Sequence, residues 1–209
     1  MRALAICLIS LCVCAGATTV RADSVIDCGK KSLAQAVRDV KDANQTITFT
    51  GVCVGSLVIA IDGLTLKGEG TAIIDGGGAD AVTINGASRV ALLNLEVTNG
   101  GNGIVAQNGA HVQLTDVNSH DNAGAGIVVK SASTAVLTGI SATHNGGVGL
   151  RADDGAGIAL TSSTISDNAS QGISLTFGTR ADLRTLVFDT YTCDATVLVR
   201  GASGIVCPH

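Results

Sequence analysis

A repeat of 23 residues, present four times in succession between positions 99 and 190, sets the strongest limit on how this chain can fold. Each copy begins with Asn, has Gly at its fifth position followed by an aliphatic residue, and has Leu ten residues after that aliphatic residue. The repeated Asn are Asn99, Asn122, Asn145 and Asn168, and the repeated Gly are Gly103, Gly126, Gly149 and Gly172. A unit this short cannot bury its own apolar face, so the units must stack on one another.

Within each repeat, apolar and polar residues alternate over short runs, as in the segment 111–117, and Gly, Asn, Asp and Ser lie between the runs. This pattern is typical of strands joined by turns. The leucine-rich pattern is absent, and the period of 23 residues is not a multiple of the hexapeptide step of left-handed β-helices. The sequence therefore predicts an all-β fold, a right-handed parallel β-helix with one coil per repeat and about six coils.

Equivalent positions of successive coils lie directly above one another in such a fold. The four repeated Asn are therefore expected to form one column, in which side-chain amides hydrogen-bond from coil to coil. The repeated Gly is expected either at a backbone position with positive φ or in a crowded turn. Both residues are structural in this interpretation.

The segment before the repeats contains one convincing amphipathic helix, over residues 31–42. Ser32 followed by Gln35 forms a capping box at its start. We expect this helix to cover the first coil of the solenoid, because bare strand edges would otherwise be exposed there.

Residues 1–22 have the pattern of a secretory signal peptide, with Arg2 before an apolar run and a small-residue cleavage pattern that ends at Ala22. A single β-helix domain is predicted over 23–209, with the helical cap at about 31–43 and the coils at about 46–206. We expect a secreted or periplasmic protein with no transmembrane segment after the signal is removed.

Removal of the signal leaves 11 basic and 17 acidic residues, a net charge of −6. Such a surface repels nucleic acids and anionic membranes, so neither is an expected partner.

Four cysteines remain after cleavage, and an even number in an exported chain implies disulfides. Cys28 and Cys53 precede the repeats, whereas Cys193 and Cys207 follow them. Three pairings are possible, and the economical one joins Cys28 to Cys53 and Cys193 to Cys207. Each bond would contribute about 3 kcal/mol in the chain-entropy model.

The N-terminal helix, the run Gly-Glu-Gly-Thr-Ala-Ile-Ile-Asp-Gly-Gly at 68–77 and the repeated Asn-x-x-x-Gly-Ile coils together resemble right-handed β-helix proteins of the pectin-lyase-like superfamily. The resemblance covers nearly all of the mature chain. It implies the fold and makes a polysaccharide the expected ligand, but this superfamily includes lyases, hydrolases, epimerases, tail spikes and adhesins, so it does not define an activity.

The resemblance also suggests what to look for in a site. Pectate lyases bind Ca²⁺ through several carboxylates, so Ca²⁺ is implied by resemblance alone, and the residues themselves indicate no cofactor. Of the polygalacturonase motifs, only Asp153-Asp154 is present, and these two are candidate ligand-binding residues. The alternative is a solvated turn before Gly155.

Stacking of the repeats suggests a second candidate site. Asp121, His144 and Asp167 end successive repeats, so the two carboxylates would lie about 10 Å apart with the imidazole between them. That separation is near the upper limit for the two carboxylates of an inverting glycosidase, and the same groups could hold a metal ion. These three are the candidate catalytic residues, and His120 is a further candidate for ligand binding. The alternative is that Asp and His serve here as turn formers.

Aromatic residues are scarce, with three Phe, one Tyr and no Trp, which leaves little for stacking on sugar rings. We therefore expect an exported monomeric module that binds a polysaccharide or has a structural role, without catalytic activity. One alternative is a polysaccharide lyase or glycoside hydrolase that acts on an acidic glycan. The other is a rigid adhesin-like module that binds surfaces or proteins.

Overall fold

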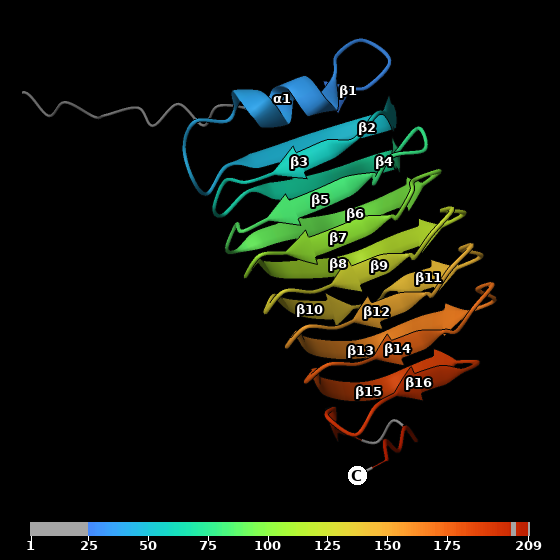
Figure 1. Cartoon of the computed structure of the whole chain (residues 1–209). Coiled ribbons are helices and arrows are strands. Elements are labelled where there is room, and N and C mark those ends of the chain that lie inside the picture. Colours follow the sequence, from blue (N-terminus) through green and yellow to red (C-terminus); the bar gives the residue numbers. More distant parts are fainter. Residues whose placement is uncertain (1–24, 202–203, 209) are drawn as a thin grey trace, which may run out of the picture.

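The computed structural model describes residues 25–201 and 204–208 as one parallel β-solenoid that narrows toward its C-terminal end (Figure 1). The predicted signal peptide lies outside the described residues. Two parallel sheets run along the solenoid, and every coil contributes to both of them.

The longer sheet, called the long sheet below, has ten strands. They are β1 (Ile26–Asp27), β2 (Thr46–Val54), β4 (Thr65–Asp75), β6 (Val90–Thr98), β8 (His111–His120), β10 (Thr134–Thr138), β11 (Ser141–Thr143), β13 (Gly157–Ser166), β15 (Arg180–Phe188) and β17 (Leu198–Arg200). In one coil a break around Gly139 divides the long strand into β10 and β11, and both pair with β8 and β13.

The shorter sheet has seven strands, one for each coil. They are β3 (Leu57–Ile59), β5 (Val82–Asn85), β7 (Ile104–Gln107), β9 (Ile127–Val129), β12 (Leu150–Ala152), β14 (Ile173–Leu175) and β16 (Tyr191–Cys193). The β-helix prediction is confirmed. The structure has seven coils, compared with the expected number of about six.

The core is a stack of aliphatic side chains in register. The repeated Leu of each coil pairs with its counterpart in the next, and all members of this column are at most 1% exposed: Leu66, Leu92, Leu114, Leu137, Leu160 and Leu183. Their outward-facing neighbours in each strand remain accessible, because side chains alternate between the faces of a strand.

The N-terminal end of the solenoid is covered by helix α1 (Leu33–Asp39), which packs on β2 and β3 (Figure 1). The Ser32 hydroxyl accepts a hydrogen bond from the backbone N–H of Gln35 at 3.2 Å, as the capping box predicts. The helix is shorter than expected, because Val40 already has an extended backbone.

Both predicted disulfides are confirmed. Cys28 is bonded to Cys53 beside the helical cap, and Cys193 is bonded to Cys207 at the C-terminal end.

The predicted Asn column is present with three members instead of four. Asn122 Nδ2 donates to Asn145 Oδ1 at 2.9 Å, and Asn145 Nδ2 donates to Asn168 Oδ1 at 2.9 Å. The prediction was wrong for Asn99, because the turn of that coil is one residue shorter. As a result Gly100 has the position that the column Asn has in the following coils, and its N–H donates to Asn122 Oδ1 at 2.9 Å.

Candidate functional site

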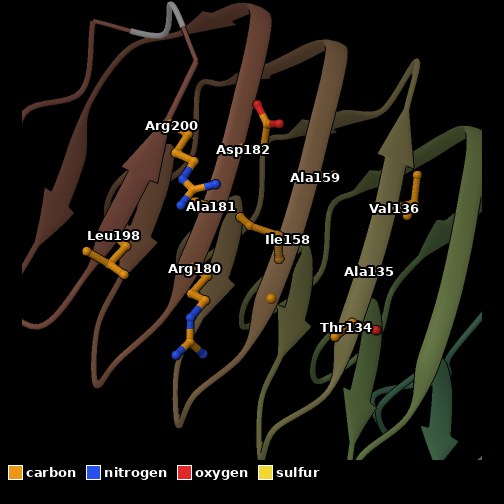
Figure 2. Close-up of a pocket in the computed structure, with 11 residues that line it drawn as sticks. Thr134, Ala135, Val136, Ile158, Ala159, Arg180, Ala181, Asp182, Leu198 and Arg200 are labelled. Carbon is orange, nitrogen blue, oxygen red and sulfur yellow. The ribbon is translucent and has the colours of Figure 1, made fainter.

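An open groove follows the outer face of the long sheet, on the N-terminal halves of its strands. One part, of about 420 Å³, crosses β10, β13, β15 and β17 (Figure 2). A second part, of about 280 Å³, lies beside it over β6 and β8. Both parts are lined by Thr134 and Val136, so they adjoin, and together they are called the axial groove below.

The floor of the axial groove is formed by small side chains. Ala91 on β6 and both Gly157 and Ala159 on β13 face outward, where longer residues would fill the space. Gly157 does not need a special backbone angle, and a Cβ placed on it would meet only the side chain of Thr134, at 3.2 Å. The floor therefore allows a bound chain to approach the sheet closely.

At the C-terminal end of the axial groove lie two exposed arginines, Arg180 on β15 and Arg200 on β17 (Figure 2). Neither forms an ion pair with any described residue. The carboxylate in this part of the groove, Asp182, is already bound by Arg184, whose Nε and Nη2 donate to it at 2.8 and 2.9 Å.

This pairing fixes the charge state of Asp182. The hydrogen bond from Arg184 is the main cause that lowers the pKa of the carboxyl, and the charge of Arg200 lowers it further. The paired Asp182 and Arg184 cancel, so the two remaining guanidinium groups give this end of the groove a positive charge.

The N-terminal end of the axial groove is lined by Arg89 and His111. Arg89 is exposed, forms no ion pair among the described residues, and has a φ angle of 57°. His111 Nδ1 lies 3.3 Å from the hydroxyl oxygen of Ser88. A third guanidinium group thus lies at the opposite end of the same groove.

The strand register puts the two ends on the same face of the solenoid. Val90 pairs with Val112, and the N–H of His111 donates to the backbone oxygen of Ala87, so Ser88 lies opposite His111 and Arg89 is an extra residue just before β6. His111 pairs with Thr134, Thr134 with Gly157, and Gly157 with Arg180. Arg89 and Arg180 are therefore separated by four coil spacings, or about 19 Å.

The candidate catalytic residues Asp121, His144 and Asp167 stack in a different place, at the turn that follows the long strands. Their φ angles are 53°, 55° and 56°. Asn, Asp and His tolerate this left-handed conformation better than other non-glycine residues, so the backbone alone accounts for the residue types in this column. All three side chains are exposed, and catalysis by them stays a prediction.

The structure links His120 to two acidic groups. Its Nδ1 lies 2.7 Å from Asp121 Oδ2, and its Nε2 lies 3.5 Å from Glu96 Oε2. Asp167 instead accepts a hydrogen bond from the hydroxyl of Ser166 at 2.9 Å. Each carboxylate of the column thus has its own local partner.

Asp153 and Asp154 lie on the short-sheet side, directly after β12. Asp154 is exposed in a turn with a φ angle of 52°. Asp153 is half-buried, with its Oδ2 at 3.2 Å from Arg151 Nε. Burial raises the pKa of Asp153 above its ordinary value, and the charge of Arg151 opposes this only in part.

Within residues 25–201 and 204–208, no three His, Cys, Asp or Glu side chains are grouped so that they could hold a metal ion. In the same part of the chain, no helix is both long and apolar enough to cross a membrane.

Sequence reasoning missed the axial groove, although part of its signal was available. His111, Thr134, Gly157 and Arg180 hold the same position of the 23-residue repeat, and aligning the repeats places them in one column. Arg200 could not be found in this way. It pairs with Asp182 after a coil of only 18 residues, outside the regular period.

The fold and the groove define a right-handed parallel β-helix with an open cationic groove along its side. The family model for the right handed beta helix region matches residues 62–190, more than half of the chain. The chain therefore belongs to the right-handed β-helix family, which confirms the resemblance that the sequence indicated.

Curated protein sequences give no match to this chain. Among solved structures, a pectin methylesterase in complex with a hexasaccharide is similar over 81% of this chain and 76% of that one, with 11% identity and a TM-score of 0.47. The A-module of the mannuronan C-5 epimerase AlgE4 from Azotobacter vinelandii is similar over 84% of this chain and 81% of that one, with 13% identity and a TM-score of 0.43.

Proposed function

We propose that the protein is an exported module that binds an anionic polysaccharide in the axial groove and does not cleave it. The observation that carries this proposal is the combination of a small-residue floor with guanidinium groups that form no ion pair with a described carboxylate, Arg89 at one end and Arg180 and Arg200 at the other. Arg is well suited to such a role, because its planar fork binds carboxylate and sulfate groups with two hydrogen bonds.

The shape of the axial groove supports a linear, hydrophilic ligand. The groove is open along its length and is not a closed pocket of the kind that buries a small molecule. Gln113 and Thr134 add an amide and a hydroxyl to its lining, and these can hydrogen-bond to sugar hydroxyls.

Binding without cleavage is favoured by the acid–base groups of the axial groove. Asp182 is its sole carboxylate among the described lining residues, and it is held by Arg184. Glycoside hydrolysis usually needs two carboxylates on either side of the scissile bond. The exposed column of Asp121, His144 and Asp167 lies at the turn after the long strands, outside the groove lining.

The test is a binding and turnover screen with the purified mature protein. Uronate-containing, sulfated and neutral polysaccharides are assayed for co-sedimentation and for unsaturated or reducing-end products, with Ca²⁺ and with chelator. We expect binding of acidic polymers without products, at least a tenfold loss in the double variant Arg180→Gln, Arg200→Gln, and no loss in Arg38→Gln, a control on the capping helix.

Other outcomes would overturn the proposal in recognisable ways. Products that disappear in the triple Ala variant of Asp121, His144 and Asp167 would make the protein an enzyme with its site at the turn column. Equal binding of neutral and acidic polymers would remove the role of the arginines. No binding to any polymer would favour a structural or protein-binding module.

A further inference from the structure

The two cationic ends of the axial groove belong to one continuous path. The register places Arg89, His111, Thr134, Gly157 and Arg180 on successive coils, and the two parts of the groove share Thr134 and Val136. Between the ends the path carries no described carboxylate, since Asp182 lies beside Arg200 at the C-terminal end (Figure 2). A polyanion can therefore follow the whole path without meeting like charge repulsion in its middle.

We propose that one polysaccharide chain lies parallel to the solenoid axis and bridges Arg89 to Arg180 and Arg200, so that tight binding requires a minimum chain length. This inference rests on the proposed function and adds to it the direction of the bound chain and the length class of the ligand. A short oligomer contacts one end only, whereas a longer one contacts both.

The spacing of the coils suits this arrangement. Neighbouring strands of the sheet are about 4.8 Å apart, and a pyranose unit in an extended chain advances it by a similar length. Successive anionic sugars can therefore stay in step with successive coils. Four coil spacings separate Arg89 from Arg180, so the shortest bridging oligomer has five sugars.

The floor between the two ends supports a path along the axis. Gly157 and Ala159 are half-buried, outward-facing positions on β13 with little side chain above the sheet, and Ala91 is similar on β6. Val136, which is 52% exposed, is the largest apolar side chain at the junction of the two parts and can pack against the face of a sugar ring.

Bridging predicts a step in affinity, not a gradual rise. Once an oligomer is held at one end, its other end meets the second arginine site at a high effective concentration, which strengthens binding by a large factor without any new type of contact. Single exposed ion pairs are weak on their own, so we expect the step to be about tenfold.

The test is a length series of oligogalacturonates, from disaccharide to octasaccharide, titrated calorimetrically at low ionic strength against the mature wild-type protein. Affinity should rise about tenfold between the tetrasaccharide and the hexasaccharide and then level off. Arg89→Gln should abolish the step, so that the hexasaccharide binds no more tightly than the tetrasaccharide. Sulfated oligosaccharides of the same lengths show whether carboxylate or sulfate fits better.

Two results would overturn the inference, and they can be told apart. Affinity that rises smoothly with length in both the wild-type protein and Arg89→Gln would leave the proposed function standing and reject the bridge. No binding of either oligomer class at any length would reject both. The matched control is Arg38→Gln, which should keep the step.

Discussion

Asn145 occupies the space that a side chain on Gly126 would need. A Cβ placed on Gly126 would lie 2.7 Å from Asn145 Nδ2 and 2.8 Å from the backbone oxygen of Gly149. None of the four repeated Gly has positive φ, so of the two explanations considered from sequence, crowding is the correct one. The Asn and the Gly of the repeat are therefore required together, because the side-chain amide of each column Asn packs against the Gly of the preceding coil.

Gly126→Ala is expected to destabilise the protein by about 1–3 kcal/mol, since the added methyl group must displace the backbone of Gly149 and the side-chain amide of Asn145. Equilibrium denaturation in urea measures this. Gly157→Ala, whose added Cβ meets only a Thr134 methyl group, is the control and should change the unfolding free energy by less. Equal losses in both variants would refute the crowding explanation.

His144→Val should lower the unfolding free energy by roughly 1–2 kcal/mol, because a β-branched residue is more strained in the left-handed region than His is. His144→Gly should be close to wild type, because Gly adopts that conformation freely. Thermal unfolding of the two variants checks this. If both variants lose stability equally, the backbone explanation of the Asp121, His144, Asp167 column is wrong.

Asp153→Asn is expected to stabilise the protein at neutral pH. The pKa of Asp153 is raised in the folded state, mainly by burial, so its contribution to stability is fully present below its ordinary pKa and is lost as pH rises through the raised value. The gain from the Asn variant should therefore shrink as pH falls toward 3.8 and below. Unfolding free energies measured across acidic pH, with the exposed Asp154→Asn as control, test the sign.

Removal of the Cys193–Cys207 disulfide should expose the C-terminal edge of the solenoid. In the double Ser variant we expect a loss of about 3 kcal/mol and self-association through the open edges of β16 and β17, because unpaired strand edges pair with other chains. Sedimentation velocity measures the association. A variant that stays monomeric would show that this bond does not protect the edge.

The sequence predicts the architecture well because the structural repeat of the fold is also a repeat of residue types along the chain. The 23-residue period, the column of repeated Leu and the economical pairing of the cysteines all follow from residue spacing. The place of Asn99 could not be predicted, because the loss of one residue in its turn is visible only in the register of β6 with β8.

The candidate site was harder to predict for a physical reason. Arg89, Arg180 and Arg200 lie far apart in the sequence, and only the stacking of coils brings them to one face. A residue such as His144 draws attention in the sequence because His is chemically versatile, yet its φ angle gives it a role in the turn. Outward-facing positions carry no packing pattern, so a groove formed by small side chains leaves little trace in hydropathy.

The most direct test of the account is to fill the axial groove and measure what remains of binding. Ala159→Phe places a ring on its floor, and Thr164→Phe, on the other half of the same strand, is the matched control. We predict that isothermal titration with polygalacturonate gives at least a tenfold weaker affinity for Ala159→Phe and an unchanged affinity for Thr164→Phe. Wild-type affinity in Ala159→Phe would contradict the assignment of the ligand to this groove.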